Sequence, residues 1–376
     1  MRVLMGMPDS HSLGGPAACE PPFVAELRRL GAEVAEETYV YGGKLSQTRL
    51  RQRVVRVLAT ARRLSRRGRE AEFDIIHLNS SFDTMALLRD AATLQALRPT
   101  RARIFVKFHG SDAALFETTS PALRALVRFV LGRIDGIGLL SAEERENFRR
   151  AGVDRGKLFI VKNVVAAGGA DDEPTPPPPQ QSANLHTKLS VDAETPLLLF
   201  IARFIPAKGL TDVLDACAIL RDEGRAFRLL CLGDGAARGA AEAQAAHLGL
   251  NDRVRFFGYV PETETPEFYA GSTMLVFPTY HYEGFPMVIF KSVAAGLPII
   301  TTRIRAAADY LREPDNCLWV EPQNPQMLAA KISQLLDQPE VRAAMRRHNL
   351  ELARQFTAGV VAPEYLEIYN QLVNRA

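Results

Sequence analysis

The sequence predicts an α/β protein built from two doubly wound parallel sheets, each belonging to its own domain. Short β-rich runs alternate with helical patterns along all 376 residues. The runs are almost continuously apolar, which is typical of parallel strands covered by helices on both faces. Alternation of strand and helix in this way is the pattern of doubly wound sheets.

The expected strands fall into two groups. Those in the first half read RVLMGMP, FDIIHLN, RIFVKFHG, GIGLLS and LFIVKN. Those in the second half read PLLLFIARF, FRLLCLGDG, VRFFGYV, TMLVFPT, LPIITT and CLWVEP. Helical segments separate them, such as residues 17–31 and 121–133.

A break in composition separates the halves. Residues 168–188 are rich in Pro, Gly and Gln and poor in apolar side chains, which predicts an exposed linker with no fold of its own. We therefore expect a first domain over residues 1–165, a Pro-rich linker over 166–190 and a second domain over 191–358.

Composition narrows the class of protein. The apolar fraction of 47% is that of a soluble globular chain, and no apolar run reaches the roughly 18–20 residues that span a bilayer. The four scattered cysteines indicate buried thiols in a reducing compartment, so we expect a cytoplasmic protein. Residues 1–165 hold 27 Lys and Arg against 18 Asp and Glu, which indicates an anionic surface or substrate facing the first half. We expect no nucleic-acid partner.

The most informative segment runs from Tyr280 to Thr302. Glu283 follows an apolar run, Gly284 permits a tight turn, and Pro286 suits the first position of a helix that continues to Gly296. A carboxylate is thereby placed beside a helix N-terminus, which attracts anions. This arrangement suits a site that holds sugar hydroxyls and a diphosphate.

Two further strand ends carry candidate site residues. Arg203 and Lys208 follow the first strand of the second half, and two cations in such a loop suit a diphosphate, although surface Arg and Lys are more often simply solvated. His109 stands at the end of RIFVKFHG, where ligands bind in open α/β sheets; the alternative is a structural histidine. Gly14 and Gly15 follow the first strand and would let the backbone approach a ligand, or simply form a turn.

Residues 49–69 predict a basic amphipathic helix. Its apolar stripe is Leu50, Val54, Val57, Leu58, Ala61 and Leu64, surrounded by nine arginines with no acid until Glu70. Such a helix suits an anionic membrane surface. The alternative is a solvated helix whose stripe packs on the first sheet, and both can hold together.

These segments together resemble the family 4 retaining glycosyltransferases, which have the GT-B fold. The matching motifs occur in family order: the Gly14-Gly15 loop, the strand-end His109, LLSAEERENFRRAGV, VKNVV, ARFIPAKG, LGDG, VRFFGYVPE, FPTYHYEGFPMVIF, AAGLPIITT and the closing CLWVEPQNPQMLAAKISQLLDQPEVRAAM. The resemblance implies two Rossmann-like domains facing a central cleft, with a nucleotide sugar bound by the second. It also implies that the last helix, about 360–376, packs back on the first domain.

The resemblance assigns roles residue by residue. Arg203 and Lys208 would bind the donor diphosphate, Glu283 would hold the donor sugar, and His109 would lie beside that sugar on the acceptor side. The donor-binding residues expected in this way are Gly14, Gly15, Arg203, Lys208, Gly284, Phe285, Pro286 and Lys291. No metal or cofactor is implied, and the co-substrate is expected to be a UDP- or GDP-sugar.

Lys291 departs from the family pattern. The family usually has a second glutamate eight residues after the first, contacting the donor ribose hydroxyls. A lysine can only donate hydrogen bonds, so we expect weak donor binding. We expect Lys291 to pair with Glu283, to contact a donor phosphate or to extend into solvent.

The sequence therefore predicts a metal-independent retaining glycosyltransferase acting on a glycan, a lipid-linked or a small-molecule acceptor, with peripheral contact at the inner membrane face through residues 49–69. One alternative is an accessory protein whose donor binding Lys291 has weakened. Another is a different GT-B enzyme class, such as a phosphorylase or an epimerase.

Overall fold

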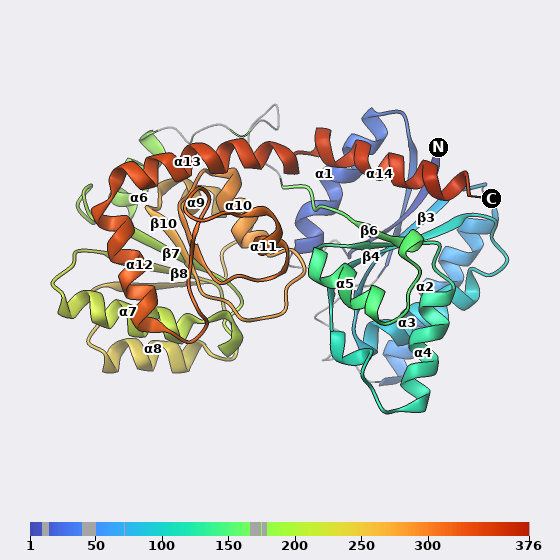
Figure 1. Cartoon of the computed structure of the whole chain (residues 1–376), viewed down its shortest axis with the longest axis horizontal. Coiled ribbons are helices and arrows are strands. Elements are labelled where there is room, and N and C mark those ends of the chain that lie inside the picture. The colour runs from blue at the N-terminus through green and yellow to red at the C-terminus, as the bar shows by residue number, and fades with distance from the viewer. Residues whose placement is uncertain (10–14, 40–49, 71, 166–173, 175–178, 376) are drawn as a thin grey trace. The chain divides into compact units, whose positions relative to one another are not determined.

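The structure is a computed structural model, and it describes residues 1–9, 15–39, 50–70, 72–165, 174 and 179–375. The chain divides into two compact units. The first unit comprises Met1–Val164, Tyr282–Phe285 and Ala358–Ala376, and the second comprises Val165–His281 and Pro286–Thr357. Each unit contains one six-stranded sheet (Figure 1).

The first sheet has the strand order β2-β1-β3-β4-β5-β6, and every pair is parallel. Its strands are β1 (Arg2–Met7), β2 (Glu33–Thr38), β3 (Ile75–Phe82), β4 (Arg103–Ser111), β5 (Gly136–Leu139) and β6 (Leu158–Ile160). Side chains alternate between the two faces. Along β4, Ile104, Val106 and Phe108 enter one apolar core, while the ring of Phe105 contacts Tyr365 on the opposite face.

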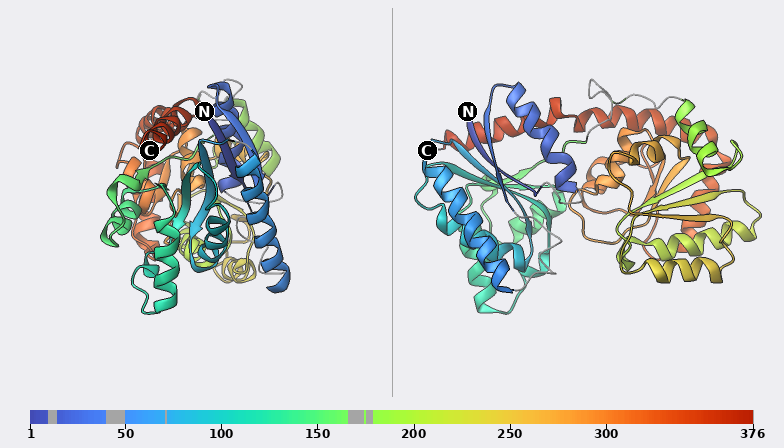
Figure 2. Two further views of the ribbon diagram at one scale, coloured as in Figure 1. Left: turned by 90° about the vertical axis from the view of Figure 1, so that its right-hand side faces the viewer. Right: turned by 180° about the vertical axis from the view of Figure 1, so that it is seen from behind.

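Helices cover both faces of this sheet (Figure 2). Helices α2 (Leu50–Glu70), α3 (Thr84–Ala96), α4 (Pro121–Gly132) and α5 (Ala142–Arg150) cover the face of the main core, and α1 (Gly15–Arg29) packs on α14 (Ala358–Val373) over the other. The ring of Tyr365 lies 4.6 Å from that of Phe23, and the Tyr369 hydroxyl lies 2.6 Å from His77 Nδ1. These contacts attach the last helix to the first unit.

The second sheet has the order β12-β11-β10-β7-β8-β9 and is also parallel. Its strands are β7 (Leu197–Ile201), β8 (Arg228–Leu232), β9 (Val254–Gly258), β10 (Met274–Phe277), β11 (Ile299–Thr301) and β12 (Leu318–Trp319). Its helices are α6 (Pro179–Leu189), α7 (Leu210–Asp222), α8 (Arg238–His247), α9 (Thr265–Gly271), α10 (Met287–Ala294), α11 (Arg305–Tyr310), α12 (Pro325–Asp337) and α13 (Pro339–Ala353). Figure 1 shows α7 and α8 on one side of these strands and α13 on the other. The predicted fold class, two doubly wound parallel sheets, is confirmed.

Two local predictions are wrong. The second half of the expected linker is helix α6, which begins at Pro179 and packs on α9 through the buried Leu185. A proline favours the first helical position, so the Pro-rich run leads into a helix rather than excluding one. The second error is that strand β2 was not predicted. It is an edge strand with the polar sequence EVAEET, in which Val34 is the single buried residue, so it lacks the continuous apolar run of the other strands. Most of residues 166–178 lie outside the described part of the chain.

Among the described residues, no helix combines the length and the apolar character needed to cross a membrane.

Candidate active site

The second sheet reverses its strand order at β7. Strands β8 and β9 follow on one side of it, and β10, β11 and β12 on the other. In open α/β sheets ligands bind outside the carboxyl ends of the strands at such a point. The loop after β7 carries Arg203 and Lys208, and the loop after β10 carries His281.

Hydrogen bonds join the loops at this edge into one structure. The Tyr280 amide donates to the Ala207 carbonyl at 2.9 Å, and the Thr279 hydroxyl donates to the same carbonyl at 3.2 Å. The Thr302 hydroxyl, after β11, donates to the Thr279 carbonyl. The loops that follow β7, β10 and β11 therefore hold one another in position.

Gly209 is required where two of these loops meet. Its φ is +80°, and a Cβ there would lie 2.6 Å from the Pro278 carbonyl oxygen. Only glycine combines that backbone conformation with that approach. Gly209 ends the 3-10 turn Pro206–Lys208 and precedes α7, so it fixes the position of Lys208.

Lys208 is a buried cation with an altered pKa. The residue is 7% exposed, and its Nζ lies 5.6 Å from the centroid of the Phe277 ring. Burial, followed by the charge of Arg203, lowers the pKa of Lys208 to about 7. A bound anion would reverse both effects, because it favours the charged ammonium.

More positive charge surrounds this point. His281 is half-buried, and burial together with the charges of Lys208, Arg203 and Arg305 lowers its pKa to about 4. Arg305 is buried and has a φ of +33°. A non-glycine residue in that region is strained and persists only where the surrounding structure holds it, which is common at functional sites. The edge of the sheet is thus suited to an anion.

The loop after β10 continues through Glu283, Gly284 and Phe285, of which Glu283 is half-buried and the other two are buried. Helix α10 then begins at Met287, so Pro286 occupies the N-cap rather than the first helical position expected from the sequence. The ligand contacts expected of these four residues stay predictions.

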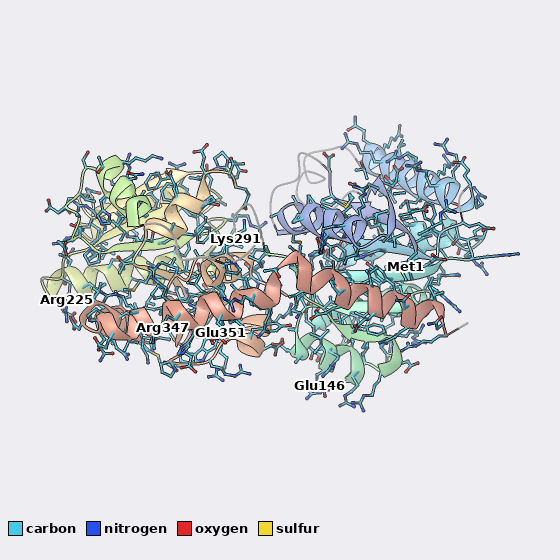
Figure 3. All side chains as sticks on the ribbon, turned by 90° about the horizontal axis from the view of Figure 1, so that it is seen from above. Met1, Glu146, Arg225, Lys291, Arg347 and Glu351 are labelled. Carbon is cyan, nitrogen blue, oxygen red and sulfur yellow. The ribbon has the colours of Figure 1, made fainter. Side chains whose placement is uncertain are left out.

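Lys291 does not pair in the way expected from the sequence. On α10, its Nζ donates to Glu262 Oε2 in the loop between β9 and α9 (Lys291 is labelled in Figure 3). The side chain of Lys291 is 18% exposed and that of Glu262 is 54% exposed. The lysine is therefore mostly covered, and its partner is an acid that the sequence analysis did not single out.

In the first unit, His109 is held at the end of β4. Its Nε2 lies 2.8 Å from Asn79 Oδ1, and Asn79 Nδ2 donates to the Gly6 carbonyl at 3.1 Å. The Gly6 carbonyl fixes the orientation of the amide, so His109 Nε2 must carry the proton and Nδ1 is the acceptor. Burial, then the charges of Lys107 and His77, lowers the pKa of His109 well below its usual range.

A buried ion pair lies beside His109. Lys107 Nζ is 2.8 Å from Glu20 Oε1, and the two side chains are 2% and 0% exposed. Burial alone would lower the pKa of Lys107, but the charge of Glu20 raises it above its usual value. Cys19, Glu20 and His109 present potential metal ligands within 4.8 Å of one another. These three residues do not suit a metal. Lys107 already forms an ion pair with Oε1 of Glu20, Nε2 of His109 is protonated, and burial raises the pKa of the Cys19 thiol, which favours its neutral form.

Of the two glycines expected to approach the donor, Gly15 begins α1 and Gly14 lies outside the described residues. The sequence analysis did not identify Glu20, Asn79, Glu262, His281 or Arg305. Among the residues around His109, Lys107 alone could have been expected from the local sequence. It stands two residues before His109 and so points to the same face of β4.

Comparison with known proteins places the chain in a family. The model described as Glycosyltransferase Family 4 matches residues 22–167, and the model described as Glycosyl transferases group 1 matches residues 181–351. With its two Rossmann-like units, the chain belongs to the family 4 (group 1) glycosyltransferases, as its motifs predicted.

Individual relatives are distant. The D-inositol 3-phosphate glycosyltransferase of Thermobispora bispora is 28% identical over 197 residues, covering 50% of this chain and 46% of the relative. The chain thus spans about half the length of the relatives that it matches by sequence.

Two solved structures match over nearly their whole length. A glycosyltransferase from Rickettsia africae has a TM-score of 0.79 at 18% identity, with 100% of this chain and 99% of the other covered. HepE of Anabaena, in complex with UDP-glucose, has a TM-score of 0.75 at 20% identity, with 98% and 99% covered. At these identities the likeness establishes the GT-B fold alone.

Proposed function

We propose that this protein is a retaining, metal-independent glycosyltransferase that transfers a sugar from a UDP- or GDP-sugar to a glycan, glycolipid or small-molecule acceptor. The observation that carries the proposal is the cationic edge of the second sheet. Lys208, Arg203 and Arg305 all act on His281 there, and the low pKa of Lys208 marks a position where an anion is favoured. A sugar diphosphate is such an anion.

The chemistry would depend on charge that develops as the glycosidic bond breaks. Arg203 and Lys208 would stabilise the departing diphosphate, an interaction stronger in the transition state than in the bound donor. Glu283 would accept hydrogen bonds from hydroxyls of the donor sugar. His109, neutral and with Nδ1 as an acceptor, would accept a hydrogen bond from a sugar hydroxyl. The leaving diphosphate itself would help to take the proton of the acceptor hydroxyl. The acceptor oxygen would attack the anomeric carbon of the sugar from the face on which the diphosphate leaves.

The relatives support the choice of donor. HepE of Anabaena was solved in complex with UDP-glucose, which is a donor of the proposed kind. The family membership favours an enzyme over the accessory alternative. A phosphorylase or an epimerase stays an outcome of the test below.

Thermal-shift measurements with UDP, GDP, ADP, TDP and their sugars test the donor, because a ligand of the native state raises the melting temperature. Turnover of the best donor with a panel of acceptors then tests transfer, with and without a chelator. We expect chelator-resistant transfer and an unchanged anomeric configuration in the product by NMR. Binding of no nucleotide, or phosphorolysis without transfer, would overturn the proposal.

We also propose that α2 contacts an anionic membrane. Of the stripe residues whose side chains the structure describes, Ala61 and Leu64, in the C-terminal half of α2, are buried. Towards its start, Val54, Val55 and Leu58 are 50%, 65% and 43% exposed. The exposed arginines of the same helix are Arg51, Arg56, Arg62, Arg66, Arg67 and Arg69. Exposed apolar side chains among arginines suit an acidic lipid surface.

Co-sedimentation with phosphatidylglycerol vesicles tests this contact. We expect binding at low salt that disappears towards 1 M, where the screening length falls to about 3 Å. Val55→Ser should weaken binding, whereas Val360→Ser, which changes an exposed valine on α14, should not. Absence of binding at low salt would end the idea.

A further inference from the structure

The ion pair between Lys291 and Glu262 lies at the ligand-binding edge of the second sheet. Glu262 stands between the end of β9 and the start of α9, and Lys291 lies one turn into α10, which follows the loop after β10. The Thr265 hydroxyl donates to the Glu262 carbonyl at 3.0 Å and holds this loop in place. The pair thus joins the loops beyond β9 and β10, on either side of β7 and β8.

The loops after β7 and β8 lie between those two ends and meet through their backbones. The Phe204 amide donates to the Asp234 carbonyl at 2.9 Å, and the Gly233 amide donates to the Gly258 carbonyl at 2.7 Å. A Cβ on Gly233 would lie 1.7 Å from the Ala202 oxygen, so this approach requires glycine. The loops after β7, β8 and β9 therefore approach one another closely through their backbones, between the cationic loop after β7 and Glu262.

We propose that Glu262 accepts a hydrogen bond from the 2′-hydroxyl of the donor ribose, and that Lys291 is the positioning residue that holds this carboxylate. The inference rests on the proposed function, because it assumes a nucleoside diphosphate at the cationic edge. A ribose is bonded directly to the diphosphate, so it lies next to the anion site. A nucleoside extending towards β8 and β9 brings its ribose to the pair.

The chemistry of the pair fits this role. A carboxylate only accepts hydrogen bonds and a vicinal diol can donate two, whereas an ammonium only donates. Lys291 donates its hydrogen bond to Glu262 Oε2. Because more than half of the glutamate side chain is exposed, Oε1 is accessible to a ligand. The family usually has a carboxylate on α10 at the position of Lys291. In this chain Glu262, in the loop before α9, would supply that carboxylate instead. The competing explanation is a surface ion pair that contributes about 0–1 kcal/mol to stability and touches no ligand.

Titration calorimetry with UDP, 2′-deoxy-UDP and inorganic pyrophosphate tests the inference. We expect the wild type to bind UDP about tenfold more tightly than 2′-deoxy-UDP, since a hydrogen bond to a charged group is lost with the hydroxyl. In Glu262→Gln the preference should fall below about threefold, with pyrophosphate affinity unchanged. Glu264→Gln, which alters another exposed acid of the same loop, is the matched control and should behave as the wild type.

Exchange of the charges adds a second test. The double variant Glu262→Lys with Lys291→Glu places the carboxylate on α10 and should restore the preference for UDP, while Lys291→Met should reduce it. Retention of the full preference in Glu262→Gln, or a wild type that binds UDP and 2′-deoxy-UDP equally, would overturn the inference and leave the proposed function standing. A wild type that binds neither pyrophosphate nor any of the nucleoside diphosphates UDP, GDP, ADP and TDP would overturn both.

Discussion

Two buried lysines, Lys107 within β4 and Lys208 in the loop after β7, lie one in each unit, and their surroundings are opposite. Lys107 is 2% exposed and faces Glu20 at 2.8 Å, which raises its pKa. Lys208 is 7% exposed and lies near a second cation, Arg203, so its pKa falls to about 7. Residue type and burial are similar, whereas the charges that shift the two pKa values have opposite signs.

The difference separates a structural charge from a functional one. The ammonium of Lys107 is compensated within the protein, so it contributes to holding α1 against β4. That of Lys208 is opposed by its surroundings, an arrangement that costs stability and is characteristic of sites that receive a ligand or carry out chemistry. Removing each charge should therefore damage a different property of the protein.

The largest effect is expected on stability from Lys107→Met. This change leaves the Glu20 carboxylate buried without its cation, and breaking a buried pair in this way costs about 3–5 kcal/mol. Urea unfolding should show the loss. The double variant Lys107→Met with Glu20→Gln should recover much of it, because no unpaired charge remains. A single variant as stable as the wild type would contradict the structural role.

Lys208→Ala and Arg203→Ala should leave stability nearly intact and reduce activity. Each removes a charge expected to neutralise the donor diphosphate, so kcat/KM should fall at least about tenfold, which is about 1.4 kcal/mol of transition-state stabilisation. Arg228→Ala, which removes a half-buried arginine at the amino end of β8, on the side of the sheet opposite to the site, is the control. Normal kinetics in both site variants would break the comparison between the two lysines.

The sequence predicted the strands because buried parallel strands are continuously apolar, and it failed at β2, an edge strand for which that rule does not hold. It located Lys208, Arg203 and His109 because each stands at or just after the end of such a strand. It could not predict the partners, since Glu20 is 87 residues from Lys107 and Asn79 is 30 residues from His109. Long-range pairs of this kind are set by packing and leave no local pattern.

Lys291 is a second residue whose partner could not be predicted from the sequence. Its identity was visible in the sequence as a lysine where an acid is usual, and the loss of a hydrogen-bond acceptor on α10 follows from that identity alone. Its partner was not visible, because Glu262 belongs to a different loop and comes close only once β9 and β10 are in place. A departure from a family pattern can therefore be recognised in one sequence, while the partner of the changed side chain is found only in the fold.

The smallest expected effect is a pH dependence of donor binding that Lys208 alone should cause. Its pKa in the free protein is about 7, below the usual lysine value of 10.5, so in the folded state the ammonium loses its proton around neutral pH. This lowered pKa reduces the free energy of unfolding as the pH falls from 10.5 towards 7, and below 7 the penalty stays constant. A bound diphosphate raises the pKa, so its affinity should be greatest below pH 7.

Above pH 7 the affinity for UDP-glucose should fall, by at most about tenfold per pH unit, because binding must then take up one proton. The neighbouring His281 does not titrate in this window, because its pKa is about 4. Calorimetry between pH 7 and 9 measures the slope, and Lys208→Arg, whose charge persists, should flatten it. A wild-type affinity that does not change over this range would show that Lys208 is already charged in the free protein, and the contrast with Lys107 would lose its electrostatic basis.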